Sequence, residues 1–99
     1  MNVFATGEEP DTTPEQRYER LLNLPPSAKL VYKVLAEDET LTQRQIRTRA
    51  LLPARTTRDA LTKLKDAELV EERLYAPDAR KRLYVSRAIA DPETMDGGT

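Results

Sequence analysis

The chain has 99 residues, of which 38% are hydrophobic, and a net charge of −1, so its length allows one small domain with a small core. It contains no cysteine and no histidine, which excludes disulfides, thiolate metal sites, the commonest catalytic base and every histidine-dependent triad. Its two serines, Ser27 and Ser86, lie outside any nucleophile-elbow pattern and its three glycines lie near the chain ends, so we expect no enzyme, no cofactor and no metal.

The two ends of the chain differ in composition from its centre. Residues 1–13 and 88–99 are polar and acidic, and we expect both to be disordered tails. No apolar run approaches the roughly 20 residues that span a bilayer, and the first residues lack the basic-then-apolar pattern of a secretion signal. We therefore expect a cytoplasmic protein without membrane contact, in which one domain covers residues 14–87.

Residues 14–22 predict a short N-terminal helix. Thr13 can cap it, and a proline occupies the first helical position, where its missing N–H costs nothing. Tyr18, Leu21 and Leu22 share one face of this helix.

A second helix is predicted after the break at Pro25-Pro26-Ser27. It ends at the acidic turn of residues 37–39. Its apolar residues recur at helical spacing, and they are Leu30, Val31, Val34 and Leu35.

Two further helices follow, separated by the break at Leu52-Pro53. Thr42 is a good cap for a helix of about two turns, in which Ile46 and Ala50 share one face. The next helix runs from about residue 53 to 67. The face that we expect to point inward consists of Thr57, Ala60, Leu61, Leu64 and Ala67.

Residues 69–75 and 81–85 predict a β-hairpin. Both runs are rich in Val, Leu and Tyr, and they flank the turn former Pro77-Asp78 within a short polar loop, residues 76–80.

Four polar side chains of the hairpin need an interpretation. Tyr75 and Tyr84 either pack against each other across the strands or form a stacking platform for single-stranded nucleic acid, and we favour packing. Glu71 and Glu72 are adjacent in a strand and point to opposite faces, which favours contact with solvent or ion pairs over shared acid–base chemistry. The predicted core consists of Leu30, Val34, Leu35, Ile46, Leu61, Leu64, Leu69, Val70, Leu74 and Leu83.

The order of these elements resembles a winged helix-turn-helix domain. Residues 41–46 look like the opening of the second helix in MarR-like regulators, residues 56–70 are similar to a recognition helix running into the first wing strand, and residues 78–82 resemble the Asp-x-Arg wing tip of the MarR family. The resemblance covers residues 27–87 and implies an α+β, mostly α fold. It predicts three core helices, a two- or three-stranded β-wing and, here, an extra N-terminal helix.

The sequence departs from the family pattern at two positions. Glu68 stands where such families place a glycine, so either a left-handed cap there carries a cost or the turn differs. Asp59 occupies a position that is often basic or neutral, which bears on the strength and the geometry of DNA contact. The excess of arginine over lysine, 11 to 5, together with abundant threonine and acidic ends, resembles small regulators of halophilic archaea.

Charge is segregated along the chain. Residues 27–87 carry 14 basic and 9 acidic side chains, a net charge of +5, while residues 1–26 and 88–99 each carry −3. A basic centre in this fold favours double-stranded DNA as the partner.

The resemblance implies a recognition helix in the major groove and a wing, residues 76–82, on the adjacent backbone or minor groove. Arginine can bind guanine through two hydrogen bonds, so Arg55 and Arg58 are the leading candidates for base or phosphate contact. The short helix before them implies phosphate contacts that position the domain. Solvated surface charge is the plainer alternative for each. The predicted DNA-binding residues are Gln43, Arg44, Arg47, Arg55, Thr56, Arg58, Thr62, Lys63, Arg80, Lys81 and Arg82.

We therefore expect a sequence-specific DNA-binding transcription regulator that acts as a homodimer. The candidate dimer surfaces are the face of residues 14–22 and the exposed face of the second helix near Tyr32. The alternative is a winged-helix module for protein–protein interaction or assembly. The predicted recognition helix keeps this alternative open, because its charge is mixed: Asp59 and Asp66 lie among its basic side chains.

Overall fold

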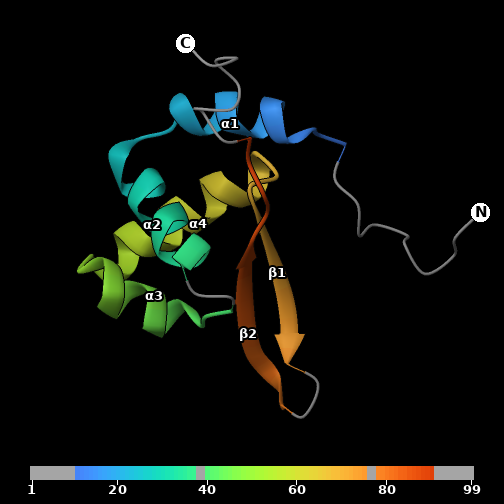
Figure 1. Cartoon of the computed structure of the whole chain (residues 1–99). Coiled ribbons are helices and arrows are strands. Elements are labelled where there is room, and N and C mark those ends of the chain that lie inside the picture. The colour runs from blue at the N-terminus through green and yellow to red at the C-terminus, as the bar shows by residue number, and fades with distance from the viewer. Residues whose placement is uncertain (1–10, 38–39, 76–77, 91–99) are drawn as a thin grey trace, which may run out of the picture.

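A computed structural model of the chain describes residues 11–37, 40–75 and 78–90. Within them lie the helices α1 (Pro14–Leu22), α2 (Pro26–Glu37), α3 (Gln43–Ala50) and α4 (Ala54–Asp66), followed by strands β1 (Val70–Tyr75) and β2 (Asp78–Ser86). Figure 1 shows α1 at one end, α3 at the other, and the hairpin beside the helices and extending past them. The predicted fold class, mostly helical with an antiparallel wing and an extra N-terminal helix, is confirmed.

α1 and α3 each begin with a capping box, at the predicted cap residues Thr13 and Thr42. The Thr13 hydroxyl accepts a hydrogen bond from the backbone N–H of Gln16, and the Gln16 side chain accepts one from the backbone N–H of Thr13. Thr42 and Gln45 make the same reciprocal pair. Each box satisfies two N–H groups that have no partner within the helix.

The buried face of α2 differs from the predicted one. Leu30 is 40% exposed, while Ala28 and Tyr32 are buried with Val31 and Leu35. The prediction that Tyr32 lies on an exposed face was therefore wrong. Its hydroxyl donates a 2.6 Å hydrogen bond to the carbonyl oxygen of Arg87, and a satisfied hydroxyl removes the main cost of burying a tyrosine.

The turn between α3 and α4 is tight and contains a strained residue. Leu51 ends α3 in the left-handed conformation, with φ 58° and ψ 41°. Pro53 caps α4 and is not its first helical residue. The predicted inward face of α4 is confirmed by burial of Thr57, Ala60, Leu61 and Leu64.

Glu68, between α4 and β1, also has a positive φ, 64°. Of the two alternatives for this position, the left-handed residue is therefore the one observed. One of its carboxylate oxygens, Oε1, is buried and has no hydrogen-bond partner among the described residues. A non-glycine residue pays in backbone strain for such a φ.

The register of the hairpin corrects two predictions. Tyr84 pairs with Glu72 and Tyr75 with Asp78, so the tyrosines are not cross-strand partners. Tyr84 is buried in the core, which removes it as a stacking platform. Because β2 begins at Asp78, the predicted loop over residues 76–80 was too long; residues 76–77 lie outside the described part.

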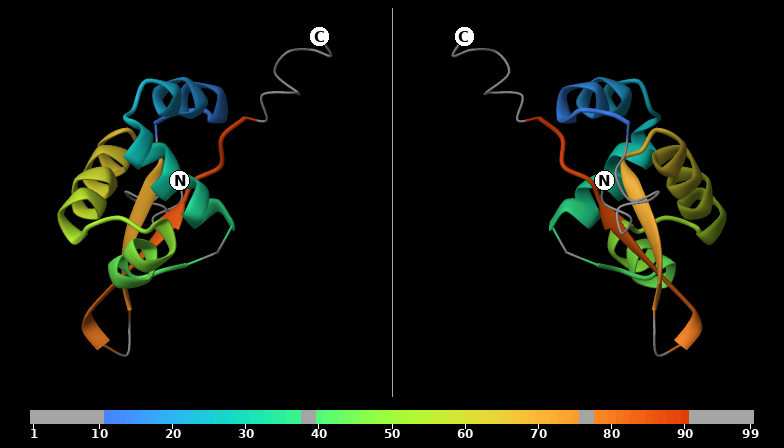
Figure 2. Two further views of the ribbon diagram at one scale, coloured as in Figure 1. Left: turned by 90° about the vertical axis from the view of Figure 1, so that its left-hand side faces the viewer. Right: turned by 90° about the vertical axis from the view of Figure 1, so that its right-hand side faces the viewer.

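Leu74 is 62% exposed and was wrongly assigned to the core. It pairs with Arg82, next to the last pair of the hairpin, Tyr75 with Asp78. In both views of Figure 2 the hairpin extends past the helices. An alternating strand pattern predicts a buried face only where another element covers it.

The chain just before α3 joins the hairpin through Leu41, two residues ahead of the helix. Leu41 and Tyr84 exchange backbone hydrogen bonds of 3.2 and 2.8 Å, which form an isolated antiparallel bridge. This bridge ties the chain entering α3 to the second half of β2.

The packed region extends beyond residues 14–87. Thr12 is buried, and the backbone N–H of Ala90 donates to the carbonyl oxygen of Pro14 at 3.1 Å. Ile89 packs against the core. The remaining parts of the two predicted tails, residues 1–10 and 91–99, lie outside the described residues. No helix in the described part is long and apolar enough to cross a membrane.

Candidate nucleic-acid interface

The first turns of α4 carry the two leading candidate arginines. Arg55 and Arg58 are both exposed and lie three residues apart, so they share one side of the helix. Asp59 is also exposed on α4, which lowers the local positive potential. The first turn of α4 contains no acidic residue.

The remaining α4 candidates differ in what they can donate. Lys63 is exposed, and Thr56 is half-buried. Thr62 is exposed, but its hydroxyl donates a 3.1 Å hydrogen bond to the carbonyl oxygen of Arg58. A hydroxyl has one donor proton, so Thr62 can accept from a ligand in this rotamer but cannot donate to phosphate.

On α3, the candidates Gln43, Arg44 and Arg47 line one open hollow of about 360 Å³. The structure therefore brings these three predicted residues together. A neighbouring hollow of about 320 Å³ adds residues that the sequence reasoning did not select. It is lined by Arg44, Gln45, Thr48 and Arg49.

The wing contributes Lys81 and Arg82, both exposed on β2. The side chain of Arg80 lies outside the described part of the chain, so its predicted contact with DNA stays a prediction. Figures 1 and 2 show α3 and the outer half of the hairpin at the end of the molecule opposite α1.

Glu72 joins the wing to α4. Its Oε2 accepts a 2.8 Å hydrogen bond from Nη1 of Arg82, and its Oε1 accepts one from Nζ of Lys65. The bond from Lys65, with that from Arg82, holds the pKa of Glu72 below its usual value, although burial acts in the opposite direction. The prediction of an ion-pair role for this residue is confirmed; the identity of its partners was not predicted.

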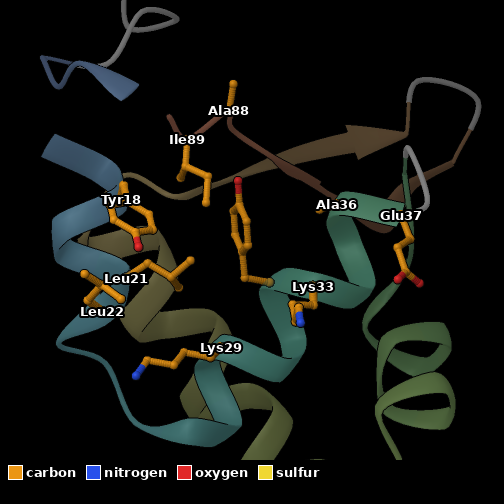
Figure 3. Close-up of a pocket in the computed structure, with 10 residues that line it drawn as sticks. Tyr18, Leu21, Leu22, Lys29, Lys33, Ala36, Glu37, Ala88 and Ile89 are labelled. Atoms are coloured by element: carbon orange, nitrogen blue, oxygen red, sulfur yellow. The ribbon is translucent and has the colours of Figure 1, made fainter. Parts of the chain in front are cut away.

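A groove lies away from these basic residues, between α1, α2 and the chain that leaves β2 (Figure 3). Its volume is about 680 Å³. It brings together the two predicted dimer surfaces, since α1 supplies one wall and Tyr32 lines the groove although only 5% exposed. Burial raises the pKa of the Tyr32 phenol, with Arg17 opposing it. The lining residues are Tyr18, Leu21, Leu22, Lys29, Tyr32, Lys33, Ala36, Glu37, Ala88 and Ile89.

Comparison with known proteins gives structural neighbours only. No protein-family model and no curated protein sequence matches the chain. Among solved structures, the zinc-responsive MarR family member ZitR of Lactococcus lactis is 22% identical with a TM-score of 0.60, over 66% of this chain and 44% of that one. YusO of Bacillus subtilis is 15% identical with a TM-score of 0.62, over 86% and 54%.

A third neighbour, reduced AbfR, was solved bound to DNA. It is 23% identical with a TM-score of 0.60, over 84% of this chain and 56% of its own. The fold is a winged helix-turn-helix. ZitR is described as a MarR family member, and a further neighbour, SP03579, as a MarR family transcription regulator. This chain spans about half the length of the neighbours compared above.

In this fold α3 and α4 are the helix-turn-helix pair, and β1 with β2 is the wing. The predicted DNA-binding residues whose side chains are described lie on these elements. The groove lies elsewhere, between α1, α2 and residues 88–89. Sequence reasoning missed the Glu72 contacts because Lys65, Glu72 and Arg82 are brought together by strand register and not by helical spacing.

Proposed function

We propose that the chain is a transcription regulator that binds double-stranded DNA sequence-specifically, with α4 in the major groove and the wing on the adjacent backbone or minor groove. The observation that carries this proposal is the exposure of Arg55 and Arg58 at the start of the second helix of the helix-turn-helix pair. The DNA-bound neighbour of the same fold supports it. A helix N-terminus in the major groove is the docking geometry that this motif uses.

The proposed contacts divide into two classes. Arg55 and Arg58 bind base edges or phosphate, and Thr56 offers a methyl group to thymine. The others bind phosphate or the minor groove and fix the orientation of the domain. They are Gln43, Arg44, Arg47, Lys63, Arg80, Lys81 and Arg82. Thr62, whose hydroxyl proton bonds the carbonyl oxygen of Arg58, can contact DNA only by accepting a hydrogen bond from a base amino group.

We further propose that two chains associate through the groove face of α1. Leu22 is 52% exposed beside the groove and Tyr18 is half-buried, so apolar surface is available there for a second copy. A two-fold dimer would present two α4 helices to half-sites about one DNA turn apart. Light scattering should give a dimer mass at micromolar concentration and a monomer mass for Leu22→Glu; a monomer for the unmodified chain contradicts the proposal.

The deciding experiment measures affinity for duplex DNA as a function of salt. Each phosphate contact that is lost lowers the log–log slope by about one unit. We expect this loss for Arg55→Ala and for Arg58→Ala if they contact phosphate, and a changed sequence preference if they contact bases. Arg20→Ala removes the same charge from α1, where Arg20 bonds the carbonyl oxygen of Ala67, and should leave the slope unchanged.

Two outcomes would overturn the proposal. Absence of duplex binding at low salt contradicts DNA binding, and equal affinity for every duplex in a random-sequence selection contradicts sequence specificity. The alternative function, a protein-interaction module, is favoured by the apolar groove. A stable protein partner that is retained by Arg55→Ala and Arg58→Ala, in a chain that does not bind DNA, would support it.

A further inference from the structure

Glu72 is held between two cations, one on α4, the proposed recognition helix, and one on the wing. Lys65 lies in the last turn of α4 and Arg82 lies on the wing strand β2. Both donate to the one carboxylate, each to a different oxygen. The Glu72 side chain is only 17% exposed, whereas those of Lys65 and Arg82 are 41% and 63% exposed.

The difference in exposure makes the contact asymmetric. The two cations can turn towards an external anion, but the carboxylate cannot follow them into water. If phosphate draws either cation away, Glu72 is left as a partly buried charge with fewer partners, which is unfavourable. To bind Lys65 or Arg82, a phosphate must therefore displace the carboxylate of Glu72. Phosphate and carboxylate are both anionic acceptors of hydrogen bonds from these cations.

We propose that Glu72 withholds Lys65 and Arg82 from DNA phosphate and so limits the affinity of this chain for DNA of any sequence. The proposal rests on the proposed function and names a residue that sets its specificity. Affinity that does not depend on sequence comes from cations that release DNA counterions. A cation neutralised by Glu72 contributes less to this release, while base contacts from α4 are unaffected.

The chain offers a matched control in the preceding residue. Glu71 has the same charge and is next in sequence, but its Oε1 accepts from Nη2 of Arg73 at 3.1 Å. It pairs with Val85, whereas Glu72 pairs with Tyr84, so the two carboxylates lie on opposite faces of the hairpin. Removal of either charge changes the net charge equally.

The first experiment measures binding of a mixed-sequence duplex over a salt series. Glu72→Gln should bind more tightly, with a log–log salt slope steeper by about one to two units, one for each cation released. Extrapolated from 1 M to 0.1 M salt, one unit of slope is about a tenfold gain in affinity. Glu71→Gln removes the same charge but does not release Lys65 or Arg82, so it should change the slope by less than Glu72→Gln does.

A double-mutant cycle separates this effect from a general change in charge. In a chain carrying Lys65→Gln and Arg82→Gln, the further change Glu72→Gln should have no effect on the slope, because the withheld cations are gone. An equal gain in both backgrounds overturns the inference. Glu72→Met serves as a second variant if Glu72→Gln does not show cooperative unfolding.

Failure of the inference can be distinguished from failure of the proposed function. If the unmodified chain binds duplex DNA and Glu72→Gln binds equally or more weakly, the inference is wrong and the proposed function stands. If neither the unmodified chain nor Glu72→Gln binds duplex DNA at low salt, DNA binding itself is wrong.

Discussion

Nε of Arg17 donates a 2.7 Å hydrogen bond to the carbonyl oxygen of Ala88, 71 residues further along the chain. Nη1 of the same guanidinium donates to the carbonyl and hydroxyl oxygens of Thr12, at 2.7 and 3.0 Å. Arg17 is only 7% exposed. It therefore fastens α1 to the chain on both sides, and these bonds hold one wall of the groove in place.

Replacement of Arg17 by leucine should lower the free energy of unfolding by about 2–3 kcal/mol, because it leaves the buried carbonyl oxygen of Thr12 and the partly buried carbonyl oxygen of Ala88 without this donor. Urea denaturation measures this change. Arg20→Leu is the control, since the 3.3 Å hydrogen bond from Arg20 to Ala67 is exposed and should contribute less than about 0.5 kcal/mol. Equal losses in the two variants would contradict the role assigned to Arg17.

Replacement of Glu68 by glycine should raise the free energy of unfolding by about 1 kcal/mol. It relieves the left-handed backbone and removes the buried carboxylate oxygen that has no described partner. Leu51→Gly relieves the same kind of strain at a side chain that is 88% exposed. Its gain should be smaller, and thermal unfolding of the two variants compares them; a loss of stability in Glu68→Gly would contradict the argument.

Alanine at Thr42 should lower the free energy of unfolding by about 1 kcal/mol, because it removes the side-chain half of the capping box of α3. Thr48 is exposed in the interior of the same helix, where alanine is the better helix former. Thr48→Ala should therefore leave stability unchanged or slightly higher. Chemical denaturation of both variants is the measurement, and a similar loss in both would contradict the capping role.

The stabilisation that Glu72 provides should depend on pH. Its pKa in the folded chain lies below its ordinary value of 4.5, so the unfolded chain takes up the proton first as the pH falls. The contribution is complete above the unfolded pKa and is lost as the pH falls through the folded pKa. The difference in urea midpoint between the unmodified chain and Glu72→Gln should be constant near neutrality and shrink below pH 4.5; a difference that grows on acidification would contradict it.

The helices could be predicted because their signals are local. Thr13 and Thr42 each precede a glutamine at the third helical position, and prolines mark the starts of α1, α2 and α4. The inward face of α4 followed from its period alone. The face of α2 did not, because two overlapping sets of residues at helical spacing fit the same helix. The buried set includes Tyr32, whose hydrogen-bond acceptor, the carbonyl oxygen of Arg87, lies 55 residues away in sequence.

The parts that could not be predicted depend on residues far apart in sequence. Arg17 had no signal for burial, since its acceptors include a carbonyl oxygen at Ala88. The partners of Glu72 required the exact register of β1 and β2, which a hairpin with imperfect alternation does not specify. The candidate arginines on α4 needed only the helical period and the order of elements, which are visible in the sequence.

The bond between Ala90 and Pro14 places the entry and the exit of the packed body side by side, next to α1 and opposite α3 (Figure 1). A fluorophore or surface tether attached at either end of this body would therefore emerge at one pole, with the helix-turn-helix and the wing tip facing away from the support. A small label there leaves access to duplex DNA open. A bulky fusion partner at either end would instead crowd the groove face of α1. A fusion that still binds a single half-site but no longer binds a palindrome would indicate that two chains associate through that face.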